Sequence, residues 1–76
     1  PADGPTARVC ELAVSMALVC DSISYERFIR AAVEVLPTPG GERDTRRAHV
    51  IRAMRAISAT RSGPLEVRGD EVVFKD

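Results

Sequence analysis

The chain has 76 residues, a formal net charge of zero, 45% hydrophobic residues and only 4% aromatic residues. This length gives one small domain, and the hydrophobic fraction argues against disorder. No apolar run approaches the roughly 20 residues of a membrane span, and the lack of tryptophan disfavours a base-stacking platform for single-stranded nucleic acid or RNA.

The first residue is Pro1 rather than methionine, so we expect residues 1–4 to end a linker and residues 5–76 to form one domain of a longer protein. Cys10 and Cys20 both fall on the first expected helix, about 15 Å apart along its axis, whereas a disulfide needs Cα atoms within about 7 Å. We therefore expect both to be buried, as small hydrophobic residues in a reduced compartment. With His49 as the one histidine, the sequence predicts no metal site and no cofactor.

The first helix is expected to begin near Pro5 or Thr6, since proline is favoured in a first turn and threonine can cap, and to run to about Cys20. Its apolar residues recur at three- and four-residue spacing: Val9, Leu12, Ala13, Met16, Val19 and Cys20. Further apolar surface comes from Cys10, Val14, Ala17 and Leu18. This is more than one small core requires, so the helix is either central or meets another domain or subunit.

Residues 21–24 interrupt the helical pattern, and Ile23 is the apolar candidate for a short strand there. Ser24 is a natural N-cap for a second helix, with Glu26 in its first turn. The apolar series of this helix is Tyr25, Phe28, Ile29, Ala32, Val33 and Leu36. Tyr25 is expected as a core ring with its hydroxyl at the edge, and residues 37–41, with two prolines and two glycines, end the helix.

A third helix is expected over about residues 44–60, capped by Asp44 or Thr45. Its core side carries Val50, Met54, Ile57 and, more loosely, Ile51. The opposite side carries Thr45, Ala48, His49, Arg52, Ala56 and Ala59, with Arg55 at its edge.

The third helix is also where the positive charge collects. Residues 42–62 hold six arginines against two acids, residues 1–41 hold three arginines against five acids, and residues 63–76 hold two bases against four acids. The net charge of zero is therefore the sum of one basic helix and the two acidic segments on either side of it.

The pattern of residues 65–74 predicts two short strands around a Gly69-Asp70 turn. Leu65 and Val67 alternate with polar neighbours, as a half-buried strand requires.

Three segments in this order, residues 22–28, 46–54 and 65–74, resemble the winged helix-turn-helix superfamily, and the resemblance covers nearly the whole chain. It implies an α+β fold with three helices and a C-terminal β-hairpin wing, and it implies binding to double-stranded DNA. The third helix would then lie in the major groove.

The resemblance also implies roles for individual side chains. Base edges would be contacted from Thr45, Ala48, His49 and Arg52. Phosphates would be contacted by Arg43, Arg46, Arg47 and Arg55. Arg68 at the wing tip would reach the minor groove or the backbone, although Asp70 and Glu71 beside it oppose deep insertion.

Other interpretations stay open. The basic face is alternatively a solvated surface, and His49 a plain surface residue. The neutral charge, the apolar first helix and the acidic wing also fit a protein-interaction or self-association module, or a purely helical packing module without a true wing. We expect no catalysis and no small-molecule substrate in this domain, because no nucleophile–base pattern or phosphate-binding glycine loop is present. The longer protein that contains this domain is expected to be a transcription regulator or a replication ATPase or helicase. Its expected location is cytoplasmic (nucleoid-associated) or nuclear.

Overall fold

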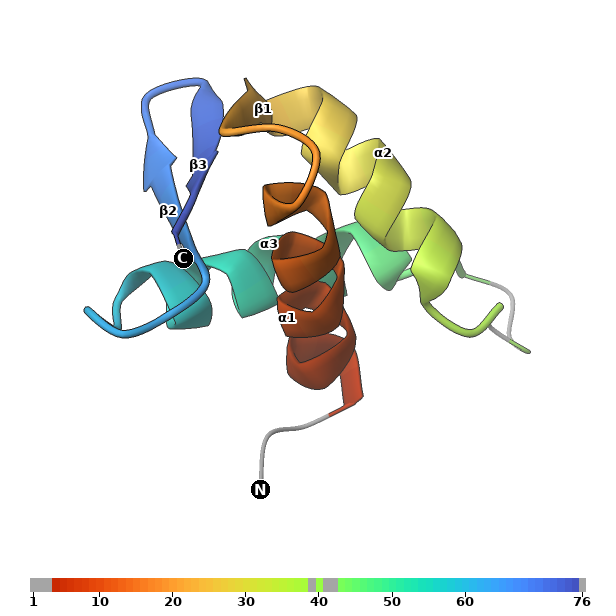
Figure 1. Ribbon diagram of the computed structural model, residues 1–76. Coiled ribbons are helices and arrows are strands. Elements are labelled where there is room, and N and C mark those ends of the chain that lie inside the picture. Colours follow the sequence, from red (N-terminus) through yellow and green to blue (C-terminus); the bar gives the residue numbers. More distant parts are fainter. Residues whose placement is uncertain (1–3, 39, 41–42, 76) are drawn as a thin grey trace.

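The computed structural model describes residues 4–38, 40 and 43–75. These residues form an α+β fold with three helices and a three-stranded antiparallel sheet (Figure 1). The elements in chain order are α1 (Gly4–Ala17), β1 (Ser22–Ser24), α2 (Tyr25–Val35), α3 (Arg46–Ser58), β2 (Leu65–Arg68) and β3 (Glu71–Phe74). In Figure 1, α3 passes behind α1 and runs across it, while the β2–β3 hairpin stands at one end of α3.

The hairpin forms where the alternating residues predicted it. β2 pairs with β3 from Leu65 opposite Phe74 to Arg68 opposite Glu71. Gly69 in the turn has a φ of 60°, a conformation that glycine adopts without the steric cost that a Cβ brings. The hairpin excludes the purely helical alternative.

The short strand at Ile23 is confirmed as well. β1 pairs antiparallel with β3, which places Ile23 opposite Val72 and gives the strand order β1-β3-β2. The sheet therefore joins the segment before α2 to the end of the chain. A backbone hydrogen bond from Tyr25 N to Asp70 O, 2.7 Å long, fixes the start of α2 beside the hairpin turn.

The second helix begins and ends as the sequence indicates. The Ser24 hydroxyl accepts a hydrogen bond from the backbone N–H of Arg27 at 3.3 Å, which satisfies one of the free donors of the first turn. The buried residues of α2 are Phe28, Ile29 and Ala32, followed by Leu36 just after the helix.

The first helix is shorter than predicted. It ends at Ala17, and a turn follows in which the N–H groups of Val19 and Cys20 both bond to Met16 O. Because the chain leaves the helical path there, Val19 does not join the buried stripe and is 81% exposed. Cys20 lies beyond the helix rather than on it, and both cysteines are free thiols that are partly buried instead of fully buried as expected.

Every buried side chain among the described residues is apolar, and the core lies where the three helices meet the sheet. Its buried members are Val9, Ala13, Phe28, Ile29, Ala32, Leu36, Val50, Ala53, Met54, Ile57, Leu65, Val72 and Phe74. Most are aliphatic, as the composition suggests, but the rings of Phe28 and Phe74 meet at 5.8 Å between centroids and join α2 to β3. Fully burying a side chain of this size contributes roughly 1.5–3 kcal/mol.

Candidate nucleic-acid interface

One side of α3 lies in the core and the other faces solvent. The buried side consists of Val50, Ala53, Met54 and Ile57, of which Ala53 was not part of the predicted stripe. The exposed side consists of Ala48, His49, Arg52, Arg55 and Ala56, with Arg47 beside them in the first turn. The helix has 13 residues and is therefore about 20 Å long. The sequence thus placed His49, Arg52 and Arg55 correctly on an open face.

The first turn of α3 is tied down by Asp44. This carboxylate accepts hydrogen bonds from the backbone N–H of Arg46 at 3.0 Å and from its Nη2 at 2.9 Å. Thr45 occupies the N-cap position but makes no side-chain capping bond, so Asp44 supplies the acceptor. The Arg46 guanidinium holds the pKa of Asp44 at about 2, and the Arg46 side chain is only 23% exposed.

Arg47 is held in a similar way by an acid from another helix. Its Nη2 and Nη1 donate to the two carboxylate oxygens of Glu26 at 2.8 and 3.1 Å, which links α3 to the first turn of α2. The hydrogen bond from Arg47 lowers the pKa of Glu26. Both side chains are exposed, so the pair is weakened by salt and remains accessible to a competing anion.

Arg52 and Arg55 differ from these two arginines. Within the part of the chain that the structure describes, neither guanidinium has a hydrogen bond or an ion pair with another side chain. Both are exposed, three residues apart, and so lie close together on the outer face of α3. Arg43, just before the helix, is exposed too.

The start of α1 lies beside this basic face. Pro5 and Thr6 of α1 line a hollow of about 230 Å³ together with His49, Arg52 and Ala53 of α3. Thr45 and His49 also line a second hollow with the beginning of α1. This neighbourhood was not predicted from the sequence, because it depends on how two helices distant in the chain cross.

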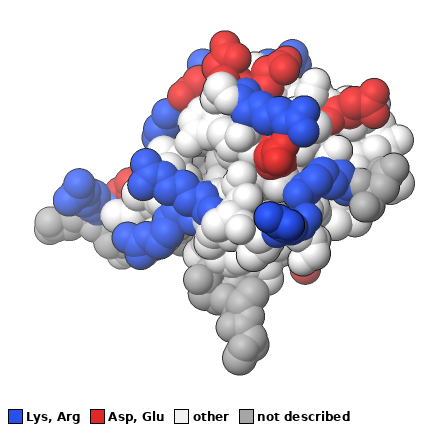
Figure 2. Space-filling model, turned by 90° about the vertical axis from the view of Figure 1, so that its left-hand side faces the viewer, with Lys and Arg blue, Asp and Glu red and all other residues white. Residues whose placement is uncertain are grey.

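The hairpin is electrostatically different. Arg68 is bonded to the Glu66 carboxylate two residues away, and Asp70 and Glu71 are exposed at the turn. In Figure 2 acidic side chains gather near the top of the molecule, with basic side chains among them, whereas basic side chains dominate the lower half of that face. Arg68 therefore lies in an acidic setting, in contrast to Arg52 and Arg55.

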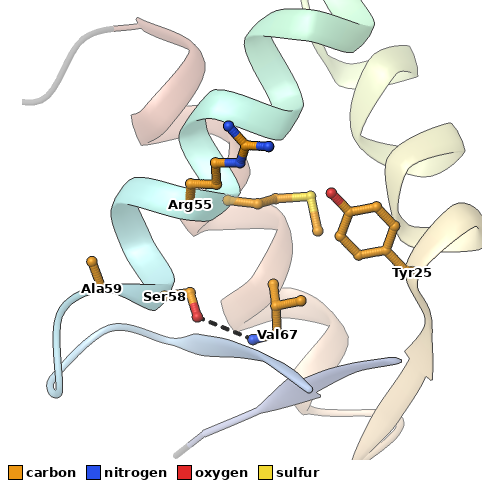
Figure 3. A pocket seen from close by; sticks show the side chains of 6 residues that line it. Tyr25, Arg55, Ser58, Ala59 and Val67 are labelled. Atoms are coloured by element: carbon orange, nitrogen blue, oxygen red, sulfur yellow. Dashed lines mark hydrogen bonds between the residues drawn. The ribbon is translucent and has the colours of Figure 1, made fainter. Parts of the chain in front are cut away.

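A groove of about 350 Å³ separates the second half of α3 from the hairpin (Figure 3). Its lining residues are Tyr25, Met54, Arg55, Ser58, Ala59 and Val67. The Ser58 hydroxyl accepts a hydrogen bond from the backbone N–H of Val67 at 3.1 Å, which fixes the hairpin to the helix. Tyr25 was predicted as a core ring, but it is half-buried and packs against the core from outside, and its place in this groove was not foreseen.

The last turn of α1 and the turn that follows it carry an exposed apolar surface, which we call the α1 end patch: Val14, Leu18 and Val19. Their exposed fractions are 57%, 85% and 81%. Val14 and Leu18 border a groove of about 490 Å³ whose other side is the loop containing Pro64. This agrees with the prediction that the first helix is more apolar than the core requires.

The described residues contain neither a metal-binding group nor a membrane-spanning helix. None of their His, Cys, Asp and Glu side chains form a group of three or more that could hold a metal ion. No helix among them has the length and apolar character needed to cross a membrane. Comparisons with protein-family models, with curated proteins and with solved structures found no match to this chain.

Proposed function

We propose that this chain is a winged-helix domain that binds double-stranded DNA by placing α3 in the major groove. The order of three helices, a short strand and a terminal hairpin supports a winged-helix layout. The observation that carries the proposal is the pair Arg52 and Arg55, both exposed on the outer face of α3 and not neutralised by a described acid. A helix of this kind fits the major groove, which is about 12 Å wide.

The geometry divides the expected contacts into two groups. Arg52 and His49 extend from the centre of the exposed face, so they and Ala48 are the residues proposed to meet base edges, with Thr45 at the rim. Arginine suits this role because it can donate two hydrogen bonds to guanine O6 and N7. Arg43 and Arg55 are the proposed phosphate contacts.

Arg46, Arg47 and Arg68 form the second group, because each already has a carboxylate partner. They are proposed as phosphate contacts only where DNA displaces the acid. The two groups predict different salt dependences, since each phosphate neutralised adds about 0.9 to the slope of log affinity against log salt.

The test is a fluorescence-anisotropy titration of a labelled duplex at about 50 and 200 mM salt. Two phosphate contacts, from Arg43 and Arg55, predict that affinity falls about 12-fold between these concentrations. Four phosphate contacts, with Arg46 and Arg47 released from their acids, predict a fall of about 150-fold. Absence of binding at tens of micromolar, with circular dichroism showing a folded chain, would contradict the proposal.

We further propose that the domain belongs to a transcription regulator or to a replication ATPase or helicase. Such a protein would act in the cytoplasm or the nucleus, where DNA is present.

A second function, protein–protein interaction or self-association, is favoured by one observation, the α1 end patch. Leu18 and Val19 are 85% and 81% exposed, and large apolar side chains that stand together in solvent often mark interaction surfaces. Sedimentation equilibrium over a range of concentrations tests self-association directly. A monomer at all concentrations would leave only a different protein as the partner of this surface.

A further inference from the structure

The groove between α3 and the hairpin combines an apolar floor with two unused polar groups. Met54, Ala59 and Val67 supply the apolar surface. The Tyr25 hydroxyl and the Arg55 guanidinium are the polar groups, and neither has a hydrogen-bond partner among the described residues. In Figure 3 the Tyr25 hydroxyl points toward α3, the helix from which Arg55 projects.

The acidic residues of the hairpin largely avoid this groove. Side chains alternate between the two faces of a strand, so Val67 faces the groove while Glu66 and Arg68 point to the other side of β2. Glu26, next to Tyr25 in the chain, is occupied by Arg47. Arg55 is the charged residue among those that line the groove.

We propose that this groove binds one nucleotide unit of the DNA backbone, an inference that rests on the proposed function. The phosphate accepts hydrogen bonds from the Arg55 guanidinium and the Tyr25 hydroxyl, and the adjoining deoxyribose packs on Val67 and Ala59. An apolar surface beside two hydrogen-bond donors matches this unit, which joins an apolar sugar face to an anion. The hairpin thus helps to hold DNA through the side of β2 that faces α3, while its acidic turn stays outside.

The discriminating variant is Tyr25→Phe. It removes the hydroxyl and keeps the ring, and the hydroxyl makes no bond within the described residues, so the fold should be unaffected. Because a hydrogen bond to a charged acceptor is lost, duplex affinity should fall about tenfold at fixed salt. The salt slope should stay the same, since no charge is removed, whereas Arg55→Ala should reduce the slope by about 0.9.

A double-mutant cycle tests whether the two residues share one phosphate. Tyr25→Phe combined with Arg55→Ala should weaken binding by less than the product of the single effects, because contacting partners are not independent. Tyr25→Phe combined with Arg52→Ala should give the full product. Arg27→Ala, an exposed arginine of α2 outside the groove, is the matched control and should change binding less than twofold.

Intrinsic fluorescence supplies a second readout, since the chain has one tyrosine and no tryptophan. Emission comes from Tyr25 alone and should change on addition of unlabelled duplex, after correction against free tyrosine in the same DNA. This inference would be overturned if the Tyr25 emission of the unaltered chain did not change with DNA and Tyr25→Phe bound the duplex with unaltered affinity. In that case a loss of affinity in Arg52→Ala would show that α3 still binds DNA. Failure of the unaltered chain to bind DNA would instead overturn the proposed function, and this inference with it.

Discussion

The two ends of α1 lie beside two very different surfaces. At its start, Pro5 and Thr6 adjoin the basic face of α3, where Arg52 projects into solvent. At its end, Val14, Leu18 and Val19 form the α1 end patch, which is apolar and exposed. A 14-residue helix separates them by about 20 Å.

Exposure has different energetic consequences for charged and for apolar side chains. An exposed arginine is well hydrated, so its exposure does not destabilise the folded chain. Exposure of the basic face is therefore not evidence for a ligand by itself, and the evidence comes from its unpaired positive charge. Leu18 is different, because its exposed side chain leaves apolar surface in contact with water. A partner that covered this surface would gain binding free energy of about 25 cal/mol per Å² buried. The two surfaces are far enough apart to act independently, and the following predictions test that independence.

The largest expected effect is on the basic face. Arg52→Glu combined with Arg55→Glu replaces two free cations with anions and should weaken duplex binding on the order of 100-fold at 50 mM salt. Self-association, measured by sedimentation, should be unchanged. Arg27→Glu combined with Arg30→Glu is the matched charge reversal on α2, and an equal loss of binding there would mean that net charge, rather than the α3 face, is responsible.

The reciprocal change is made in the α1 end patch. Leu18→Ser should weaken self-association about tenfold or more, because burial of a leucine contributes roughly 1.5–3 kcal/mol. Duplex affinity should stay within twofold of the unaltered chain. Since Leu18 is 85% exposed, this substitution leaves the core intact, and a thermal melt checks that it does.

Ser15→Ala is the control on the same helix, at an exposed position outside the patch. A matching loss of association in this variant, or a loss of DNA binding in Leu18→Ser, would contradict independence of the two surfaces.

A smaller effect is expected from releasing Arg47. Glu26→Gln removes the carboxylate that accepts two hydrogen bonds from this arginine. The freed cation should raise duplex affinity several-fold and steepen the salt slope by about 0.9. Glu11→Gln, on the exposed side of α1, makes the same charge change and should leave the slope as it is.

The smallest effect is a pH dependence of stability at the start of α3. Arg46 lowers the pKa of Asp44 from its ordinary value of 3.8 to about 2 in the folded chain. A carboxyl with a depressed folded pKa stabilises the fold above its ordinary pKa, and that contribution is lost as pH falls from about 4 to about 2. Glu26 adds a loss of the same sign, because its pKa is also lowered.

Thermal melts of the unaltered chain and of Asp44→Asn should therefore differ most at neutral pH and converge near pH 2. A difference between the two melting temperatures that is constant over this range would show that the charge of Asp44 does not stabilise α3.

Local chemistry explains what the sequence predicted well. Ser24 as a cap, the apolar series of α2 and the Gly69 turn all depend on residues within a few positions of one another. The exposed positions of His49, Arg52 and Arg55 followed from the 3.6-residue period of a helix.

What the sequence missed depends on the end of a helix or on long-range packing. The early end of α1 at Ala17 exposes Val19, although the apolar spacing continues past it. The pairing of Arg47 with Glu26 joins residues from two helices, and the groove at Tyr25 needs α2, α3 and β2 together. No periodicity within one segment carries that information.

The most direct test of the central claim is a two-dimensional ¹H–¹⁵N correlation spectrum recorded while duplex DNA is added. The 8.2 kDa chain is small enough for every described amide to be followed. We predict that the largest shifts occur at Ala48, His49, Arg52 and Arg55 and at the neighbouring Tyr25, with the α1 end patch unchanged. Shifts concentrated at Val14, Leu18 and Val19 instead, with α3 unaffected, would contradict it.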